Sequence, residues 1–216
     1  MNVAACIFDL DGTVIADEDE YGAAFTKVLA SLGAKVTSSY PHVGGIGVKE
    51  NWPILLKKYK IKTKKSIDEL TKETQAAYIA QLDRVSLKPG LEKFIGELRE
   101  NGVATALATS NAWAIVERLM VQLNLQKYFD TITTGEEVRH KKPDPDIFIV
   151  TAEKLGVERE DCVVFEDSAA GISAAHGAQM RVVGIYRSEK HKAELKGADM
   201  LVRNFEGLTM AKISSL

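Results

Sequence analysis

The stretch VAACIFDLDGT, residues 3–13, decides the fold class of this 216-residue chain. It is apolar at every position from Val3 to Phe8, and two aspartates, Asp9 and Asp11, follow. An unbroken apolar run buries both faces of a strand, which is typical of a parallel sheet covered by helices on both sides. Open α/β sheets bind their ligands beyond the carboxyl ends of such strands, so the two aspartates are candidate site residues.

Further strands and helices alternate along most of the remaining chain. Short apolar runs predict strands at 103–109, 131–134, 162–165, 181–185 and 200–202. Helical periodicity covers 90–101, 112–123, 144–155 and 168–176, and a glycine stands where three of these helices would end. This alternation predicts an α/β fold with a doubly wound, parallel, Rossmann-like sheet.

Residues 15–85 depart from this alternation. They show helical periodicity over 18–32, 48–59 and 67–82 and no convincing strand, and Lys88-Pro89-Gly90 marks the return to the core. We therefore expect a small all-helical cap domain at 15–85, inserted after the first strand of a catalytic core formed by 1–14 and 86–216. The glycine-rich segment 44–47 is predicted to be a cap loop that faces either the active site or solvent.

Composition excludes several classes of protein. A net charge of -2 gives no electrostatic basis for binding nucleic acid or an anionic membrane. No apolar run is long enough to cross a bilayer, and the N-terminus lacks the pattern of a signal peptide, so we expect a cytoplasmic protein, and a monomer. Cys6 and Cys162 lie in apolar runs without metal or redox spacing and are interpreted as small buried hydrophobes.

Polar side chains follow three of the predicted strands and precede one of the predicted helices. Parallel strands end at a common sheet edge, so these side chains should converge there. The set comprises Asp9, Asp11, Ser110, Asn111, Lys142, Glu166 and Asp167.

Such a set suits phosphoryl transfer with a metal ion. Asp9 and Asp11 are two residues apart, so an extended backbone points both side chains the same way, and a cation between them would relieve their repulsion. Hard oxygen ligands suit Mg²⁺. One carboxylate can attack phosphorus and the other can act as acid and base. Ser110 and Lys142 can hold the phosphoryl oxygens.

Four segments together resemble the signatures of the haloacid dehalogenase-like (HAD) superfamily, and the resemblance covers almost the whole chain. They are Asp9-Leu10-Asp11-Gly12-Thr13, Thr109-Ser110-Asn111, Lys142-Pro143-Asp144-Pro145-Asp146-Ile147-Phe148, and Phe165-Glu166-Asp167-Ser168 with Gly171-Ile172 and Ala174-Ala175. The position of the insert is similar to that in the helical-cap subgroup, which includes phosphoglycolate phosphatase-like and β-phosphoglucomutase-like enzymes.

The resemblance implies a role for each matching residue. Asp9 would be the nucleophile and a metal ligand, and Asp11 the general acid and base, with its backbone carbonyl on the metal. Asp167 would be the main ligand from the fourth segment, with Glu166 near the metal. The remaining three would serve the substrate: Ser110 and Lys142 would hold the phosphoryl group and Asn111 would line the pocket.

These expectations indicate an Mg²⁺-dependent phosphatase that hydrolyses a small-molecule phosphomonoester through an aspartyl-phosphate. A phosphomutase of the β-phosphoglucomutase type is the alternative. That type often carries a histidine after the first signature, where this chain has Tyr21. Asp11 argues against a dehalogenase, and the complete set of site residues argues against a non-catalytic binding protein. The substrate itself is not predicted.

Two groups of polar residues receive structural interpretations. The acidic run Asp17-Glu18-Asp19-Glu20 is interpreted as a solvated helix start, which the helix dipole favours. The four histidines lack the spacing of metal ligands, and surface or structural roles are expected for them. They are His42, His140, His176 and His191.

Overall fold

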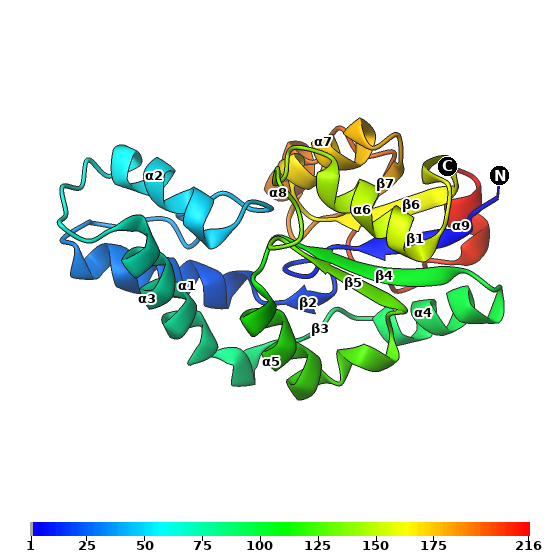
Figure 1. Cartoon of the computed structure of the whole chain (residues 1–216), viewed down its shortest axis with the longest axis horizontal. Helices are drawn as coiled ribbons and strands as arrows, with labels where there is room; N and C mark the ends of the chain where they lie inside the picture. Colours follow the sequence, from blue (N-terminus) through cyan, green and yellow to red (C-terminus); the bar gives the residue numbers. More distant parts are fainter. Residues whose placement is uncertain (1) are drawn as a thin grey trace.

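The computed structural model of the chain describes residues 2–216 and contains a six-stranded parallel sheet. The strand order is β5-β4-β1-β6-β7-β8, so the first strand lies in the middle (Figure 1). Their bounds are β1 Ala5–Phe8, β4 Ala104–Thr109, β5 Thr131–Thr134, β6 Cys162–Glu166, β7 Arg181–Ile185 and β8 Met200–Val202. The predicted fold class is confirmed, and each predicted strand lies within two residues of its expected bounds.

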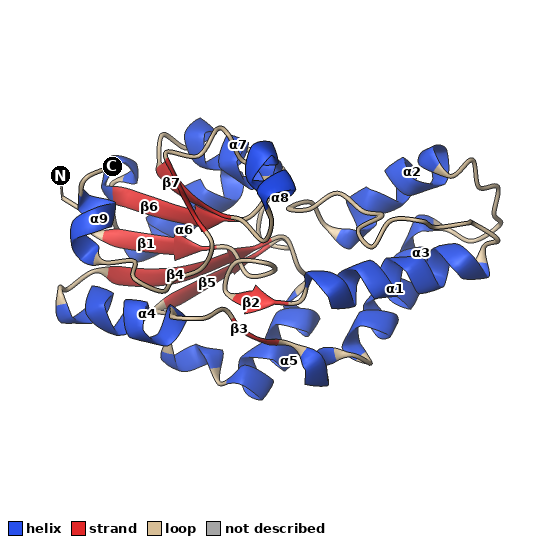
Figure 2. Ribbon diagram, turned by 180° about the vertical axis from the view of Figure 1, so that it is seen from behind, coloured by secondary structure: helices blue, strands red, loops and turns tan. Residues whose placement is uncertain are grey.

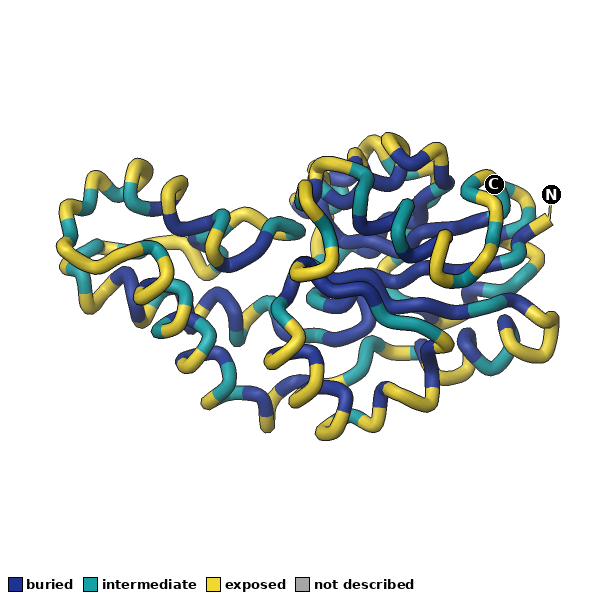
Figure 3. Tube along the Cα trace, in the orientation of Figure 1, coloured by how far each residue is buried: buried dark blue, intermediate teal, exposed yellow. Residues whose placement is uncertain are grey.

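Helices cover both faces of the sheet, as the apolar strands predicted. Alternate residues of β1 belong to two separate cores, with Phe8 in one and Ile7 in the other. The Phe8 core contains α4 (Leu91–Glu100) and α5 (Trp113–Leu123), and the Ile7 core contains α6 (Asp146–Leu155) and α7 (Ala169–Gly177). The strands β1, β4, β6 and β7 form the buried centre of the molecule (Figure 3).

Residues 15–85 form a helical body beside the sheet, which we call the cap. It contains α1 (Glu18–Ser31), α2 (Val48–Lys58) and α3 (Ile67–Ile79), and α3 packs against both other helices. Trp52 is fully buried there and donates to Thr74 Oγ1 at 3.1 Å. The exact division of the chain into two domains remains a prediction.

A small antiparallel ladder joins the cap to the core. The strands β2 (Ile15–Ala16) and β3 (Ser86–Leu87) pair where the chain leaves the core and where it returns. Neither was predicted, because two residues carry no readable alternation. The ladder holds the two connections together, so the cap faces the carboxyl ends of the parallel strands (Figure 2).

The remaining elements are short and were not predicted either. They are the 3-10 turns η1 (Leu82–Arg84), η2 (Leu125–Lys127) and η3 (Arg159–Asp161), and the helices α8 (Glu189–Glu194) and α9 (Met210–Ser214). Cys6 and Cys162 are free and buried, as expected. Within residues 2–216, no helix has both the length and the apolar character needed to span a membrane.

Candidate active site

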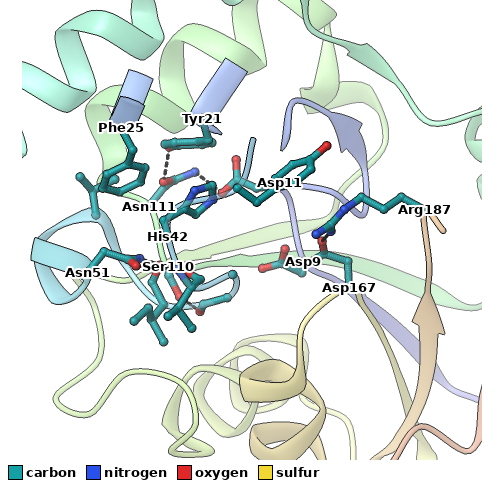
Figure 4. Close-up of a pocket in the computed structure, with 16 residues that line it drawn as sticks. Asp9, Asp11, Tyr21, Phe25, His42, Asn51, Ser110, Asn111, Asp167 and Arg187 are labelled. Carbon is teal, nitrogen blue, oxygen red and sulfur yellow. Dashed lines mark hydrogen bonds and ion pairs between the residues drawn. The ribbon is translucent and has the colours of Figure 1, made fainter. Parts of the chain in front are cut away.

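The predicted site residues meet at the sheet edge that faces the cap. Asp9 directly follows β1, Ser110 and Asn111 follow β4, and Asp167 follows β6; these three strands are neighbours in the sheet. Together with Asp11 they line one cavity between core and cap (Figure 4). The sequence predicted that these side chains would lie close together. They do so because β4, β1 and β6 are neighbours in the sheet.

Lys142 reaches the same place from the loop before α6. Its Nζ donates to Asp9 Oδ1 and to Glu166 Oε1, each at 2.6 Å, and its side chain is fully buried. Burial by itself would lower the pKa of Lys142, but the charges of Asp9 and Glu166 outweigh burial and raise that pKa above its ordinary value. Lys142 is therefore a fixed positive charge beside Asp9.

Three carboxylates form a cluster that could hold a cation. Asp9, Glu166 and Asp167 each offer an oxygen within 4.8 Å of the others. Burial raises the pKa of Asp9 to about 7, although Lys142 opposes this rise, and burial followed by the charge of Glu166 raises the pKa of Asp167 well above its usual range. A hard divalent cation would stabilise these ionised oxygens, so the residues present fit such an ion.

Glu166 differs from the other two carboxylates in its partners. Lys142 already occupies Oε1, while Oε2 accepts the backbone N–H and the hydroxyl of Ser168, both at 2.9 Å. Although Glu166 belongs to the cluster by distance, both of its oxygens are engaged by protein donors. Its geometry suits a residue that orients Lys142 better than one that binds a cation.

Asp11 lines the cavity, and its two carboxylate oxygens have different surroundings. Its Oδ2 accepts Asn111 Nδ2 at 2.7 Å, and Asn111 Oδ1 accepts the hydroxyl of Tyr21 at 2.8 Å. Oδ1 is buried and accepts no hydrogen bond from a donor in the described chain, but the neighbouring Asp17 carboxylate can share a proton with Asp11. Burial, and then the charge of Asp17, raises the pKa of Asp11 well above its usual range. A protonated Asp11 could donate its proton to a group placed in the cavity.

Asp17 is part of this site although its sequence context indicated a solvated position. It is fully buried, and its Oδ1 accepts the backbone N–H of Gly12 at 3.0 Å while Oδ2 accepts the hydroxyl of Tyr78 at 2.6 Å. The interpretation of the acidic run is therefore wrong for Asp17. The sequence held no signal for this, because Asp17 resembles the three acids after it and Tyr78 lies 61 residues away.

Gly12 lets the loop after β1 pass close to Asp167. Its φ is +73°, and a Cβ at Gly12 would overlap the Asp167 carboxylate. Gly12→Ala should cost about 1–2 kcal/mol through the left-handed backbone and, in addition, displace Asp167 and weaken cation binding. Thermal unfolding with and without Mg²⁺ measures both effects.

Gly102 provides a matched control for this prediction. Its φ is +71°, but a Cβ there would meet no atom within 4 Å. Gly102→Ala should therefore lose stability to a similar extent and keep its full response to Mg²⁺. An unchanged Mg²⁺ response in Gly12→Ala would show that Asp167 does not need this close approach.

The cap closes the cavity with aromatic side chains and a loop. The loop 43–47 lies over the site, where Gly45 O accepts the Ser110 hydroxyl at 2.9 Å, while Val43 and Gly44 are exposed, so the loop faces both the site and solvent. Lys49 and Glu50 lie outside this cavity and pair with Asp68 and Lys141. The cavity lining is completed by Tyr21, Phe25, Tyr40, His42, Val48, Asn51 and Arg187.

Comparison with known proteins places this site in a family. The sequence model of the haloacid dehalogenase-like hydrolases matches residues 6–185. The chain belongs to this family. A phosphorylated carbohydrates phosphatase of Thermotoga maritima is 33% identical over 96% of the chain and 98% of its own length. The prediction of a HAD-like phosphatase is confirmed.

Two solved structures show the same architecture over the whole chain. A CbbY variant of Rhodobacter sphaeroides, in complex with xylulose-1,5-bisphosphate, has a TM-score of 0.83 and 28% identity and covers 97% of this chain and 98% of its own. A protein of Thermotoga maritima described as a putative β-phosphoglucomutase has a TM-score of 0.73 and 30% identity, and each chain is covered completely. This chain thus resembles a named phosphatase in sequence and, in structure, CbbY and a protein described as a putative mutase.

Proposed function

We propose that this HAD-like phosphatase hydrolyses the phosphate ester of a small phosphorylated carbohydrate, using Mg²⁺ and a phosphorylated Asp9 intermediate. The observation that carries the proposal is the position of Asp9. It shares one cavity with Asp11 and Asp167, and Lys142 is bonded to its carboxylate. The name of the Thermotoga maritima phosphatase supports a carbohydrate phosphate as substrate.

The first half of the reaction transfers the phosphoryl group to the protein. The Asp9 carboxylate attacks phosphorus, and the bond from phosphorus to the ester oxygen breaks. Protonated Asp11 gives its proton to that oxygen, so the alcohol leaves uncharged. Lys142 and Ser110 hold the phosphoryl oxygens on which charge develops, and Asn111 keeps Asp11 aimed into the cavity.

The second half releases inorganic phosphate. Asp11, now ionised, takes a proton from water as the water attacks the aspartyl-phosphate, which restores the Asp9 carboxylate and the protonated Asp11. Mg²⁺ held by Asp9, Asp167 and the backbone carbonyl of Asp11 would neutralise charge on the phosphoryl group. Glu166, with both oxygens engaged, would act by holding Lys142.

Phosphate release from a panel of phosphorylated metabolites tests this proposal. We expect release from at least one carbohydrate monophosphate in Mg²⁺, a fall of at least about a hundredfold on chelation, and recovery when Mg²⁺ is added back. Release that is insensitive to chelation would refute the metal assignment. A panel without any hydrolysed monoester would refute the proposed function.

The phosphomutase alternative is favoured by the name of one structural neighbour. Tyr21 lies where a mutase histidine is expected, and its hydroxyl is committed to Asn111. Incubation with β-glucose 1-phosphate and a bisphosphate primer separates the two functions. Glucose 6-phosphate without net phosphate release would favour the mutase, whereas we expect phosphate release. A monomeric, cytoplasmic enzyme remains our expectation.

A further inference from the structure

The cap wall of the active-site cavity is uncharged. Among the described residues that line the cavity, those from the cap include no lysine, arginine, aspartate or glutamate. The cap lysines Lys49 and Lys58 lie near this wall, but Lys49 pairs with Asp68 at 2.7 Å and Lys58 donates to Pro41 O at 2.9 Å. Within this cavity the cap wall therefore offers no counter-ion to an anionic group of the substrate, whereas Lys49, Lys141 and Lys190 line two adjoining hollows.

The cavity contains one cation, Arg187, among the described residues that line it, and this residue belongs to the core. Its Nη1 lies 3.8 Å from Asp167 Oδ2, and its guanidinium lies 4.4 Å from the centre of the Tyr40 ring. The same lining holds the carboxylates of Asp9, Asp11 and Asp167. On the core side of the cavity, these three carboxylates thus offset the positive charge of Arg187.

Most polar side chains of the cap wall already have partners. Asn51 Oδ1 accepts the Val43 backbone N–H at 2.7 Å, and its Nδ2 donates to Val43 O at 3.0 Å, so this residue fixes the cap loop. The hydroxyl of Tyr21 donates to Asn111, and that of Tyr40 donates to Asp19 Oδ1 at 2.7 Å. These groups are not available to a substrate without rearrangement.

His42 is the exception. Its Nδ1 is buried and has no hydrogen-bond partner in residues 2–216, a rare state for a buried polar atom. The imidazole stacks on Phe25 with ring centres 4.8 Å apart and planes 18° apart, so its orientation is fixed. Burial, followed by the charges of Arg187 and Lys58, lowers the pKa of His42 to about 4, so the ring is neutral at pH 7. Stacking on Phe25 is the structural role that was expected of His42, and it leaves Nδ1 without a hydrogen-bond partner.

We infer that the cap wall recognises an uncharged, hydroxyl-bearing leaving group, with His42 Nδ1 as the atom that hydrogen-bonds one of its hydroxyls. The enzyme then selects singly phosphorylated sugars or polyols and discriminates against bisphosphates. This inference rests on the proposed phosphatase activity. It names the part of the substrate that the catalytic residues do not contact.

The residues that line the cavity account both for the preference for a hydroxyl-bearing leaving group and for the discrimination against a second phosphate. A sugar hydroxyl satisfies the free nitrogen of His42, while the apolar face of a sugar packs on Val43 and Ile46 of the cap loop, because the rings of Phe25 and Tyr21 are already covered by other aromatic side chains. A second phosphate would lie against the same wall without a counter-ion, and burying an unpaired charge is strongly unfavourable. The solved CbbY variant binds a bisphosphate, so this chain is expected to differ from it in specificity.

Kinetics of the unaltered enzyme in Mg²⁺ test the charge selection. We expect kcat/KM for fructose 1-phosphate to exceed that for fructose 1,6-bisphosphate by at least about a hundredfold. Equal or faster hydrolysis of the bisphosphate would overturn the inference and leave the phosphatase proposal intact. If no phosphate is released from any ester, the proposed function itself fails.

Two substitutions test the role of His42. His42→Phe keeps the stacked ring and removes Nδ1, whereas His42→Asn keeps a polar atom near that position. The measured quantity is the ratio of kcat/KM for fructose 1-phosphate to kcat/KM for phenyl phosphate, which lacks hydroxyls. This ratio should fall about tenfold in His42→Phe, because KM for fructose 1-phosphate rises, and it should recover in His42→Asn.

His176 supplies the matched control, because its side chain is 44% exposed and lies outside the cavity. His176→Phe should leave the ratio of the two kcat/KM values unchanged. If His42→Phe also leaves that ratio unchanged, or lowers both values equally, His42 does not read a substrate hydroxyl. The comparison between two substrates separates recognition from a general loss of folded enzyme.

Discussion

Asp9→Asn should reduce phosphate release by at least about 10⁴-fold, the largest effect that we expect on catalysis. The amide cannot attack phosphorus, yet it has nearly the same shape as the carboxylate. Lys142 keeps its bond to Glu166 in this variant, and the burial that raises the pKa of Asp9 no longer penalises a charge there. We therefore expect the folded structure to remain, with a thermal unfolding midpoint within a few degrees of the unaltered protein.

Asp83→Asn provides the control for this substitution, because Asp83 is exposed and lies in η1, outside the cavity. It should retain full activity. Mass spectrometry of acid-quenched enzyme gives a second measurement, since a phosphorylated Asp9 adds one phosphoryl group during turnover and the Asn variant should not gain it. Equal activity of Asp9→Asn and the unaltered enzyme would remove Asp9 from the role of nucleophile.

Much of the core was predictable because its strands are buried on both faces. A run such as residues 3–8 has to lie in a covered parallel sheet, and the order of such strands brings their polar ends together. That is why Asp9, Asp11 and Asp167 could be placed in one site before any contact was known. The three cap helices were predicted from a different signal, the helical periodicity of their apolar residues.

The network behind Asp11 could not be predicted in this way. Asp17 and Tyr78 come together because α1 and α3 pack against each other, and a contact over 61 residues leaves no local pattern. The same is true of Tyr21 and Asn111, which are 90 residues apart. Local propensity describes each helix, whereas the polar contacts depend on how the helices pack.

The position of His42 in the cavity could not be predicted from the sequence either. A single histidine in a loop is most often a surface residue, and its sequence neighbours give no reason to choose otherwise. Its position in the cavity depends on Asn51, which fixes the adjacent backbone of Val43, and on Phe25 from α1, which stacks on its ring. Three separate segments of the cap define that site, so no one of them could reveal it.

Glu166 and Asp167 illustrate how neighbours in sequence divide their work. Both follow the same strand and both are acids, so sequence could assign either to the metal. β6 ends at Glu166, and its carboxylate is held by Lys142 and Ser168, whereas Asp167 turns into the cavity. We propose that the pair supplies one residue to orient the lysine and one to bind the cation.

Lys142→Met should therefore impair both stability and catalysis. Methionine keeps the length of the side chain but leaves the buried carboxylates of Asp9 and Glu166 without their shared cation. Breaking a buried ion pair in this way costs about 3–5 kcal/mol, which corresponds to roughly 10 °C in the unfolding midpoint of a domain this size. Phosphate release should fall by at least about 10³-fold, because the phosphoryl oxygens lose a fixed positive charge.

The neighbouring lysine makes this a controlled experiment. Lys141 pairs with Glu50 on the surface, with about a third of its side chain exposed, and exposed pairs contribute about 0–1 kcal/mol. Lys141→Met should accordingly unfold within a few degrees of the unaltered protein and keep its activity. Mg²⁺ should raise the unfolding midpoint of Lys142→Met by more than that of the unaltered enzyme, since a divalent cation would compensate the charge of Asp9, which has lost its lysine partner. If the two methionine variants behave alike, the buried lysine is not what holds Asp9 ready for phosphoryl transfer.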